Sequence, residues 1–446
     1  MSYIPNTKND TNEMLKKIGV EKFEDLLKSI PKVLKSDQKL SLPEPLSELE
    51  IEKEISQITS KNLSTEKVSN FLGGGVYDHF IPKVVDFLIS RSEFATAYTP
   101  YQAEVSQGTL QAMYEFQSMI CELTQMDVTN ASMYDGATAM AEATIMAKNI
   151  TRKNKIIISE TVNPNYLKVL ETYCEPSELK IVKIKSKDMV TDIEEIEKNL
   201  DNEVAAVIMQ SPNFFGYIEN MEKVSNILQD KKTLFIANID AISLSLLKPP
   251  GNYNADIVVG EGQMLGNHLN FGGPYLGLFS TKKKYIRKMP GRIVGATKDS
   301  NGKDGFVLTL QTREQHIRRE KATSNICSNE GLNAMAATIY LALMGKSGLK
   351  DAANLCLQKS HYLYENIIKI DGFSKVTDNP FFKEFVIKTP IPAKDLILKA
   401  KDENIYAGIS LDNFFPNKTH ELIIAVTEKR TRSELDNYLE FLRNIK

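Results

Sequence analysis

The sequence is short of the residues that mark several specialised protein classes. It has 446 residues but only five histidines and four cysteines. The cysteines form no CxxC pair, so we expect no metal site and a reducing, cytoplasmic location; they are Cys121, Cys174, Cys327 and Cys356. The formal net charge is only −2, which gives no reason to expect a nucleic acid or an anionic membrane as a partner.

Long apolar runs are missing as well. No stretch approaches the length of a membrane span. Residues 1–6 lack a basic segment followed by an apolar one, so we expect no secretory signal. A chain of this length is too long for one simple core, and we expect a large domain plus a smaller one.

The clearest pattern that is present runs from Tyr98 to Lys148. After the opening Tyr-Thr-Pro-Tyr-Gln-Ala-Glu, apolar residues recur at helical spacing and predict a core-facing helix over residues 106–123. A second helix of small residues is expected to follow Gly136. Small side chains there leave the helix N-terminus open to an anion such as a phosphate, or they only let two helices pack closely; the residues favour neither interpretation.

Short apolar runs alternate with helical or mixed segments from residue 155 onward. The runs cover residues 156–158, 181–184, 204–209, 234–239, 257–259 and 276–279. Strands that are apolar throughout indicate a mainly parallel sheet with helices on both faces. Because ligands of such sheets bind at the carboxyl ends of strands, Asp240, Gln210–Asn213 and Gly260–Gln263 are expected near one edge.

The flanking regions predict smaller parts. Short helices are expected in residues 1–70, with a capping box at Ser47 and Glu50, and we interpret this region as an arm that wraps another body. Gly73–Gly75 favours a plain turn over a ligand loop. We expect a large α/β domain over 71–348, with helix and loop after 281, and a small α+β domain over 349–446. The charged run 311–321 is typical of a solvated face.

This outline resembles that of the fold-type-I pyridoxal-phosphate enzymes. In that family an Asp at a strand end pairs with the pyridine nitrogen, and Asp240 stands where it is expected. A surface Asp at a strand end would explain the same pattern equally well. With Gly136 and Thr138 at the start of the small-residue helix, Asp240 makes up a candidate, degenerate cofactor site.

The lysine that forms the Schiff base in such enzymes is missing. It should follow the run 257–259, but no Lys occurs between Lys248 and Lys282. Gln263 or Met264 stands near its position, and neither side chain can form an imine. A chain with this outline should therefore be inactive alone or complete another subunit's active site.

Longer segments resemble the glycine cleavage system P proteins and, within that family, the separate first subunit. These segments are residues 71–79, 97–108, 260–263 with 271–277, and 313–325. One departure lies at residues 264–268, where a Pro is expected after the Gln. The resemblance implies that the pyridoxal 5'-phosphate is carried by a Lys-bearing glycine dehydrogenase subunit 2, in an α2β2 heterotetramer, and that none is bound to this chain alone.

The resemblance also implies a reaction. Glycine is decarboxylated, its aminomethyl group passes to the lipoyl arm of the H protein, and carbon dioxide leaves. This chain would close the shared site through Tyr98, Tyr101, Gln102 and Glu104, which could orient the substrate and exclude water. The run 313–321 would then belong to an inter-subunit or fold-closing network. The alternatives are a non-catalytic scaffold subunit and an independent fold-type-I enzyme, which the missing Lys opposes.

Overall fold

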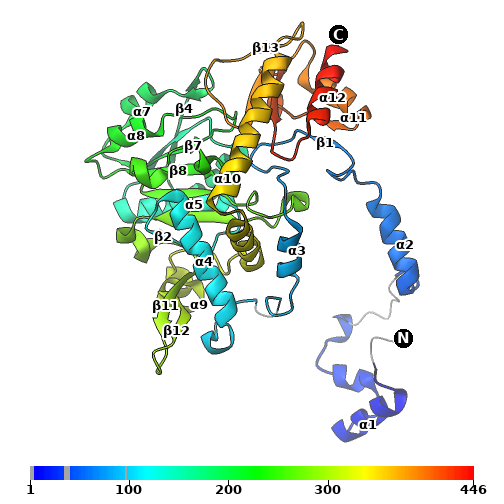
Figure 1. Cartoon of the computed structure of the whole chain (residues 1–446). Helices are drawn as coiled ribbons and strands as arrows, with labels where there is room; N and C mark the ends of the chain where they lie inside the picture. The colour runs from blue at the N-terminus through cyan, green and yellow to red at the C-terminus, as the bar shows by residue number, and fades with distance from the viewer. Residues whose placement is uncertain (1–4, 35–40, 96–97, 446) are drawn as a thin grey trace. The chain divides into compact units, whose positions relative to one another are not determined.

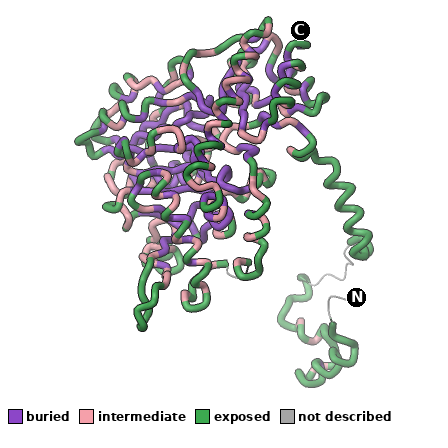
Figure 2. The backbone as a smooth tube through the Cα atoms, viewed as in Figure 1, coloured by how far each residue is buried: buried purple, intermediate pink, exposed green. Residues whose placement is uncertain are grey.

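The computed structural model describes residues 5–34, 41–95 and 98–445, in two units, Met1–Leu63 and Ser64–Lys446. The first unit holds α1 (Lys8–Ile18), the short helices η1 (Phe23–Leu27) and η2 (Lys32–Leu34), and α2 (Glu48–Thr59) (Figure 1). The predicted capping box of Ser47 and Glu50 opens α2 and is confirmed. Leu15 is the one buried side chain among the described residues of this unit, and Figure 2 shows this part of the chain almost entirely in the colour of exposed residues. The described residues of this unit therefore form no apolar core of their own.

A seven-stranded sheet organises the second unit. Its order is β2 (Val128–Thr129), β10 (Gly277–Thr281), β9 (Ile257–Glu261), β8 (Leu234–Asp240), β7 (Val204–Ser211), β3 (Lys155–Ser159), β4 (Lys180–Ile184). The last five are parallel, and β10 runs antiparallel to both of its neighbours. Each of the six apolar runs forms a strand, so the predicted mainly parallel sheet is confirmed. The carboxyl ends of β7, β8 and β9 meet at one edge.

Helices pack against this sheet. They include α4 (Gln107–Thr124), α5 (Gly136–Thr151), α6 (Pro164–Cys174), α7 (Ile193–Asn199) and α8 (Met221–Leu228). The helix α3 (Lys83–Ile89) packs on the long α10 (Gly331–Ile367), which in turn packs on α4. The two helices predicted after Tyr98 are confirmed as α4 and α5. The alanines of α5 are buried and allow close contact with β7 to β10. Among the described residues no helix is both long enough and apolar enough to cross a membrane.

Residues 293–309 correct the expectation of helix and loop. They form an antiparallel hairpin of β11 (Ile293–Lys298) and β12 (Asp304–Thr309), whose turn contains Gly302. The hairpin packs on α4 through a small cluster with Val294 and Leu308, so tertiary contact stabilises strands that carry no long apolar run. The charged run that follows includes α9 (Gln315–Arg318).

The C-terminal region has its own four-stranded sheet. Its order is β13 (Ser374–Lys375), β14 (Glu384–Lys388), β17 (Glu421–Ala425), β16 (Ile409–Ser410), and it packs with α11 (Ala393–Asp402) and α12 (Arg432–Arg443). The chain just before the glycine run joins this region, because β1 (Ser69–Asn70) pairs with β15 (Ile405–Tyr406). The domain boundary predicted at residue 348 falls inside α10, close to a break at Gly345.

Candidate functional site

A small cavity lies at the carboxyl ends of β7, β8 and β9, where the sequence places its candidate cofactor site. It measures about 30 Å³, and its lining includes Gln210, Asp240, Glu261, Met264 and Lys383. A space of this size holds about one or two water molecules, whereas sites for small-molecule ligands measure roughly 300–1,000 Å³. Side chains of this chain therefore fill most of the region.

Lys383 is the cation that Asp240 faces. Its ammonium nitrogen lies 2.6 Å from Asp240 Oδ2, and both side chains are at least nine-tenths buried. The other carboxylate oxygen, Oδ1, accepts a hydrogen bond of 2.9 Å from the backbone N–H of Ser243. The ammonium also lies 3.7 Å from the centroid of the Tyr77 ring. A buried carboxylate needs such a partner, and here the C-terminal region of the same chain supplies it.

The carboxyl group of Glu261 accepts a hydrogen bond from the first backbone N–H of α5. Its Oε2 accepts the N–H of Gly136 at 2.9 Å, and its Oε1 accepts the N–H groups of Gln263 and Leu276 at 3.0 Å each. Burial raises the pKa of the Glu261 carboxyl to about 8, although these N–H donors act in the opposite direction. The N–H of Thr138 is bound by the side chain of Asp135, which caps the helix.

The glycine run closes the cavity from the other side. The N–H of Gly74 donates to Glu384 Oε1, whose second oxygen accepts the hydroxyl of Tyr77 at 2.7 Å. A Cβ atom at Gly73 would lie 2.1 Å from that Oε1, so only glycine fits against the carboxyl. Burial raises the pKa of Glu384 to about 7. The run is a tight turn packed on a side chain of its own chain.

These residues do not fit a bound pyridoxal phosphate. The carboxylate that would pair with a pyridine nitrogen already holds Lys383, and the N–H groups of Gly136 and Thr138 already hold carboxyl groups. Gln263, which with Met264 was expected near the position of the missing Lys, makes contacts only within this chain. Its amide accepts the N–H of Tyr77 at 3.1 Å and donates to the Asn267 carbonyl at 2.7 Å.

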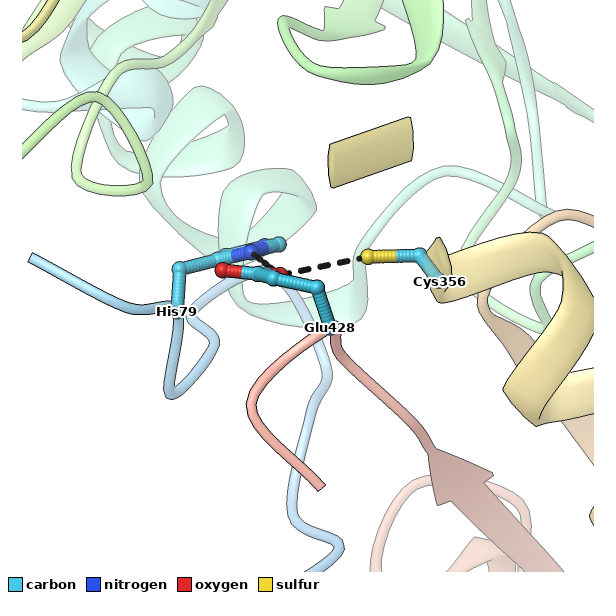
Figure 3. Close-up of side chains that lie close together, drawn as sticks. All are labelled: His79, Cys356 and Glu428. Carbon is cyan, nitrogen blue, oxygen red and sulfur yellow. Dashed lines mark hydrogen bonds and ion pairs between the residues drawn. The ribbon is translucent and has the colours of Figure 1, made fainter. Parts of the chain in front are cut away.

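Next to this cavity, His79, Cys356 and Glu428 lie side by side (Figure 3). Their ligand atoms lie within 4.8 Å of one another. His79 Nδ1 is 2.6 Å from Glu428 Oε2, the Cys356 thiol donates to the same oxygen, and His79 Nε2 is 3.0 Å from Lys383 Nζ. The contacts are consistent with an imidazole that donates from Nδ1 to Glu428 and accepts at Nε2 from the ammonium.

The charges in this cluster favour protons over a metal ion. Burial acts to raise the pKa of Glu428, but the interaction with His79 and the N–H of Phe80 outweigh burial and lower the pKa to about 2. Burial raises the pKa of the Cys356 thiol well above its ordinary value. A thiol held in its protonated form beside an ammonium is a poor metal ligand. The expectation of no metal stays a prediction.

The four residues predicted to act in catalysis lie elsewhere, on the loop before α4. Tyr98 is 83% exposed and Tyr101 is 52% exposed, and Gln102 and Glu104 are exposed too. None of the four lines the cavity at Asp240. All four lie at the surface of this chain, and the hydroxyl of Tyr101 is bound from the inside by Arg292.

A buried arginine, Arg292, holds this loop. One terminal nitrogen, Nη1, donates to Thr99 Oγ1 at 3.2 Å, and the other, Nη2, donates to the Tyr101 hydroxyl at 2.9 Å. The guanidinium also binds the Ser328 hydroxyl and the Cys327 carbonyl. Its Nε lies 3.4 Å from Glu314 Oε2.

Comparison with known proteins decides the family. The sequence model of the family "Glycine cleavage system P-protein" matches residues 1–442. The chain belongs to this P-protein family. The chain is 50% identical to the "Probable glycine dehydrogenase (decarboxylating) subunit 1" of Carboxydothermus hydrogenoformans, over 99% of both chains. It is also 50% identical to the protein of the same name from Chloroherpeton thalassium, over 100% of both chains. The resemblance inferred from the sequence motifs is confirmed.

Solved structures support the same assignment. A crystal structure described as glycine decarboxylase (P-protein) of the glycine cleavage system, in inhibitor-bound form, matches with a TM-score of 0.92 and 39% identity over 99% of both chains. A glutamate decarboxylase from Lactobacillus brevis matches with a TM-score of 0.68 and 12% identity, over 92% of this chain and 94% of its own. The latter shows the fold alone. Together they confirm the predicted fold-type-I class.

Sequence reasoning missed Lys383, Glu384 and Arg292. A faint signal was present for the first two, because they interrupt the apolar residues around 381–387 with adjacent opposite charges. Charges inside a buried strand need partners and so mark a polar contact. Arg292 follows a Pro-Gly pair and carries no comparable signal. The run Gln311–Lys321 is only partly a solvated face, because the side chains of Arg313 and Glu314 are largely buried.

Proposed function

We propose that this chain is the first subunit of glycine dehydrogenase (decarboxylating) and that it acts only together with a Lys-bearing second subunit. One observation carries the proposal. The stretch that should bear the Schiff-base Lys has no lysine and holds Gln263 and Met264 near its position, and the amide of Gln263 is fixed by Tyr77 and Asn267. The pocket that would receive the cofactor is filled by this chain's own side chains. The match to relatives named subunit 1 over their full length supports the same division.

In the proposed complex the second subunit carries pyridoxal phosphate, which supplies the electron sink for decarboxylation of glycine. The aminomethyl group then passes to the lipoyl arm of the H protein, and carbon dioxide leaves. This chain contributes the wall of the shared site. The hydroxyls of Tyr98 and Tyr101 and the amide of Gln102 orient the substrate, and the loop excludes water from it.

The shape of the loop supports this role. Pro100 is buried and restricts the backbone, while the tyrosines beside it are exposed. The loop leads directly into α4, whose apolar face is packed in the core. Side chains on such a segment are presented to a partner at little cost in conformational entropy. The exposed arm, with its unburied apolar residues, supports a role for residues 1 to about 60 in binding the second subunit.

Reconstitution tests the proposal. The chain, a Lys-bearing relative, lipoylated H protein and glycine are combined, and carbon dioxide release is measured together with sedimentation of the complex. We expect decarboxylation only when both subunits are present, from a complex of α2β2 mass. Full activity of the second subunit without this chain would contradict the proposal. Full activity of the complex when Tyr98, Tyr101 and Gln102 are all replaced would leave this chain as a scaffold.

A further inference from the structure

The contacts of Arg292 point to a role that the proposed function does not yet include. Arg292 is 3% exposed and lines a cavity of only about 10 Å³, which leaves room beside its guanidinium for about one water molecule. Two of its hydrogen-bond acceptors, Thr99 and Tyr101, belong to the loop proposed to close the shared site. We infer that Arg292 is a positioning residue, which fixes these two hydroxyls for the reaction. The inference rests on the proposed function and deepens it.

The guanidinium is itself held from the opposite side. It donates to the Ser328 hydroxyl at 2.9 Å and to the Cys327 carbonyl at 2.7 Å, and its Nε faces the buried carboxyl of Glu314. The backbone carbonyl of Arg292 accepts the N–H of Ala131 at 2.8 Å. Because the planar guanidinium is anchored in this way, the hydroxyls of Thr99 and Tyr101 that accept from it are held at fixed positions relative to each other. Contacts with buried residues therefore determine the conformation of the loop.

The direction of the hydrogen bonds has a chemical consequence. Arg292 donates to the oxygen of each hydroxyl, so the proton of Tyr101 and the proton of Thr99 are both free to point elsewhere. A hydroxyl that accepts from a cation is also polarised as a donor. Tyr101 is half exposed, and its ring packs edge-on against His316 at 5.6 Å. Each hydroxyl thus keeps its proton for a further acceptor, and an anionic oxygen such as a substrate carboxylate would suit both.

Lysine cannot reproduce this arrangement. An ammonium keeps the positive charge but has no planar fork, so it cannot hold Thr99, Tyr101, Ser328 and the Cys327 carbonyl together. Arg292→Lys therefore keeps the positive charge but removes the planar set of hydrogen-bond donors, so it tests the two contributions separately. Arg430→Lys is the matched control, because Arg430 is 2% exposed and its guanidinium binds Asp78 and Glu434 without touching the loop.

The first arm of the test needs no activity. Hydrogen exchange of the backbone amides of residues 98–106 is followed in the intact chain as wild type, Arg292→Lys and Arg430→Lys. We expect about tenfold faster exchange in the Arg292 variant alone, because hydrogen bonds from a charged group are lost. Equal exchange in the wild type and the Arg292 variant would overturn the inference even if the complex is fully active.

The second arm uses the reconstituted complex and a double-mutant cycle with Tyr101→Phe. We expect Arg292→Lys to lower kcat/KM for glycine about tenfold, with the KM for the H protein unchanged, and the double variant to be no worse than the poorer single variant. The inference would be overturned if the two substitutions lowered kcat/KM independently, so that their fold-effects multiply in the double variant. It would also be overturned if Arg292→Lys kept full activity while Tyr101→Phe lowered kcat/KM. An inactive wild-type complex would instead overturn the proposed function, and the exchange arm would still decide on Arg292.

Discussion

The ammonium nitrogen of Lys383 lies 2.6 Å from a carboxylate oxygen of Asp240 inside the protein. Asp240 ends a strand of the central sheet, and Lys383 comes immediately before β14 of the C-terminal sheet. The pair thus ties two sheets together at the point where a fold-type-I enzyme would place a cofactor. This internal pairing provides the basis for the first two predictions.

The isolated chain should not form a stable adduct with pyridoxal phosphate. Lys383 is the lysine that lines the cavity, and its amine is engaged with Asp240 and His79. We expect borohydride reduction to leave no stoichiometric label at a defined site, as judged by mass spectrometry of peptides. The reconstituted complex is the positive control. A stoichiometric label on one lysine of this chain, lost when that lysine is replaced, would contradict the prediction.

Breaking the ion pair should cost more than removing it. Lys383→Met leaves the Asp240 carboxylate buried without a cation, and we expect a loss of about 3–5 kcal/mol in the free energy of unfolding. Adding Asp240→Asn to this variant should restore about 2–3 kcal/mol. Urea unfolding measures both effects. Lys429→Met is the control, since Lys429 is partly exposed and Asp78 keeps its second partner, Arg430. Additive losses in the double variant would show that the pair is not coupled.

Much of the fold follows from local sequence, whereas the cavity does not. The strands around Ile157, Val207 and Ile236 can be recognised in the sequence because a buried parallel strand is apolar on both faces. The partner of Asp240 lies far along the chain, and no spacing rule links it to Lys383. The hairpin of β11 and β12 was missed although β12 contains the short apolar run Phe306–Leu308, because its strands are stabilised by contact with α4, which is distant in sequence.

Stability should fall as the pH rises from about 5 to 8. The pKa of Glu261 is raised to about 8 in the folded chain, and that of Glu384 to about 7, both by burial. The ordinary pKa of Glu is about 4.3, so in this window the folded state binds more protons than the unfolded state. The stabilising contribution is complete below the ordinary value and is lost as the pH passes through the raised one. Each carboxyl should contribute a slope of up to about 1.4 kcal/mol per pH unit.

Glu261→Gln tests this pH dependence because glutamine mimics the protonated carboxyl. We expect the variant to lose part of the slope of unfolding free energy against pH, as measured by urea unfolding between pH 5 and 8. Glu122→Gln, at an exposed position on α4, should keep the wild-type slope. An unchanged slope in the Glu261 variant would show that this carboxyl does not take up a proton on folding.

The N-terminal arm should be needed for assembly. Leu49 on α2 is 77% exposed, and Leu26 and Ile55 are exposed as well. Deleting residues 1–60 should weaken association with the second subunit because apolar surface that the partner covers is removed. Replacing Leu49, Ile55 and Ile58 by Ser should also weaken this association. Replacing Glu52 and Glu54 by Ser is the control and should leave the association unchanged. Sedimentation that shows an unchanged complex after the deletion would exclude this role for the arm.

The loop from Tyr98 to Glu104 should contribute to turnover without contributing to assembly. Tyr98→Phe removes an exposed hydroxyl and keeps the ring, whereas Tyr101→Phe also removes the oxygen that accepts from Arg292 Nη2. We expect turnover to fall about ten- to a hundredfold, which corresponds to roughly 1.4–2.7 kcal/mol of transition-state stabilisation. Steady-state kinetics on the reconstituted complex measures the effect, with sedimentation and cofactor absorbance as controls. If the tyrosines only pack, stability changes slightly and turnover stays at the wild-type value in both single variants and in the double variant. That result would remove the loop from the mechanism, because an exposed hydroxyl that contacts the substrate cannot be lost without a kinetic effect.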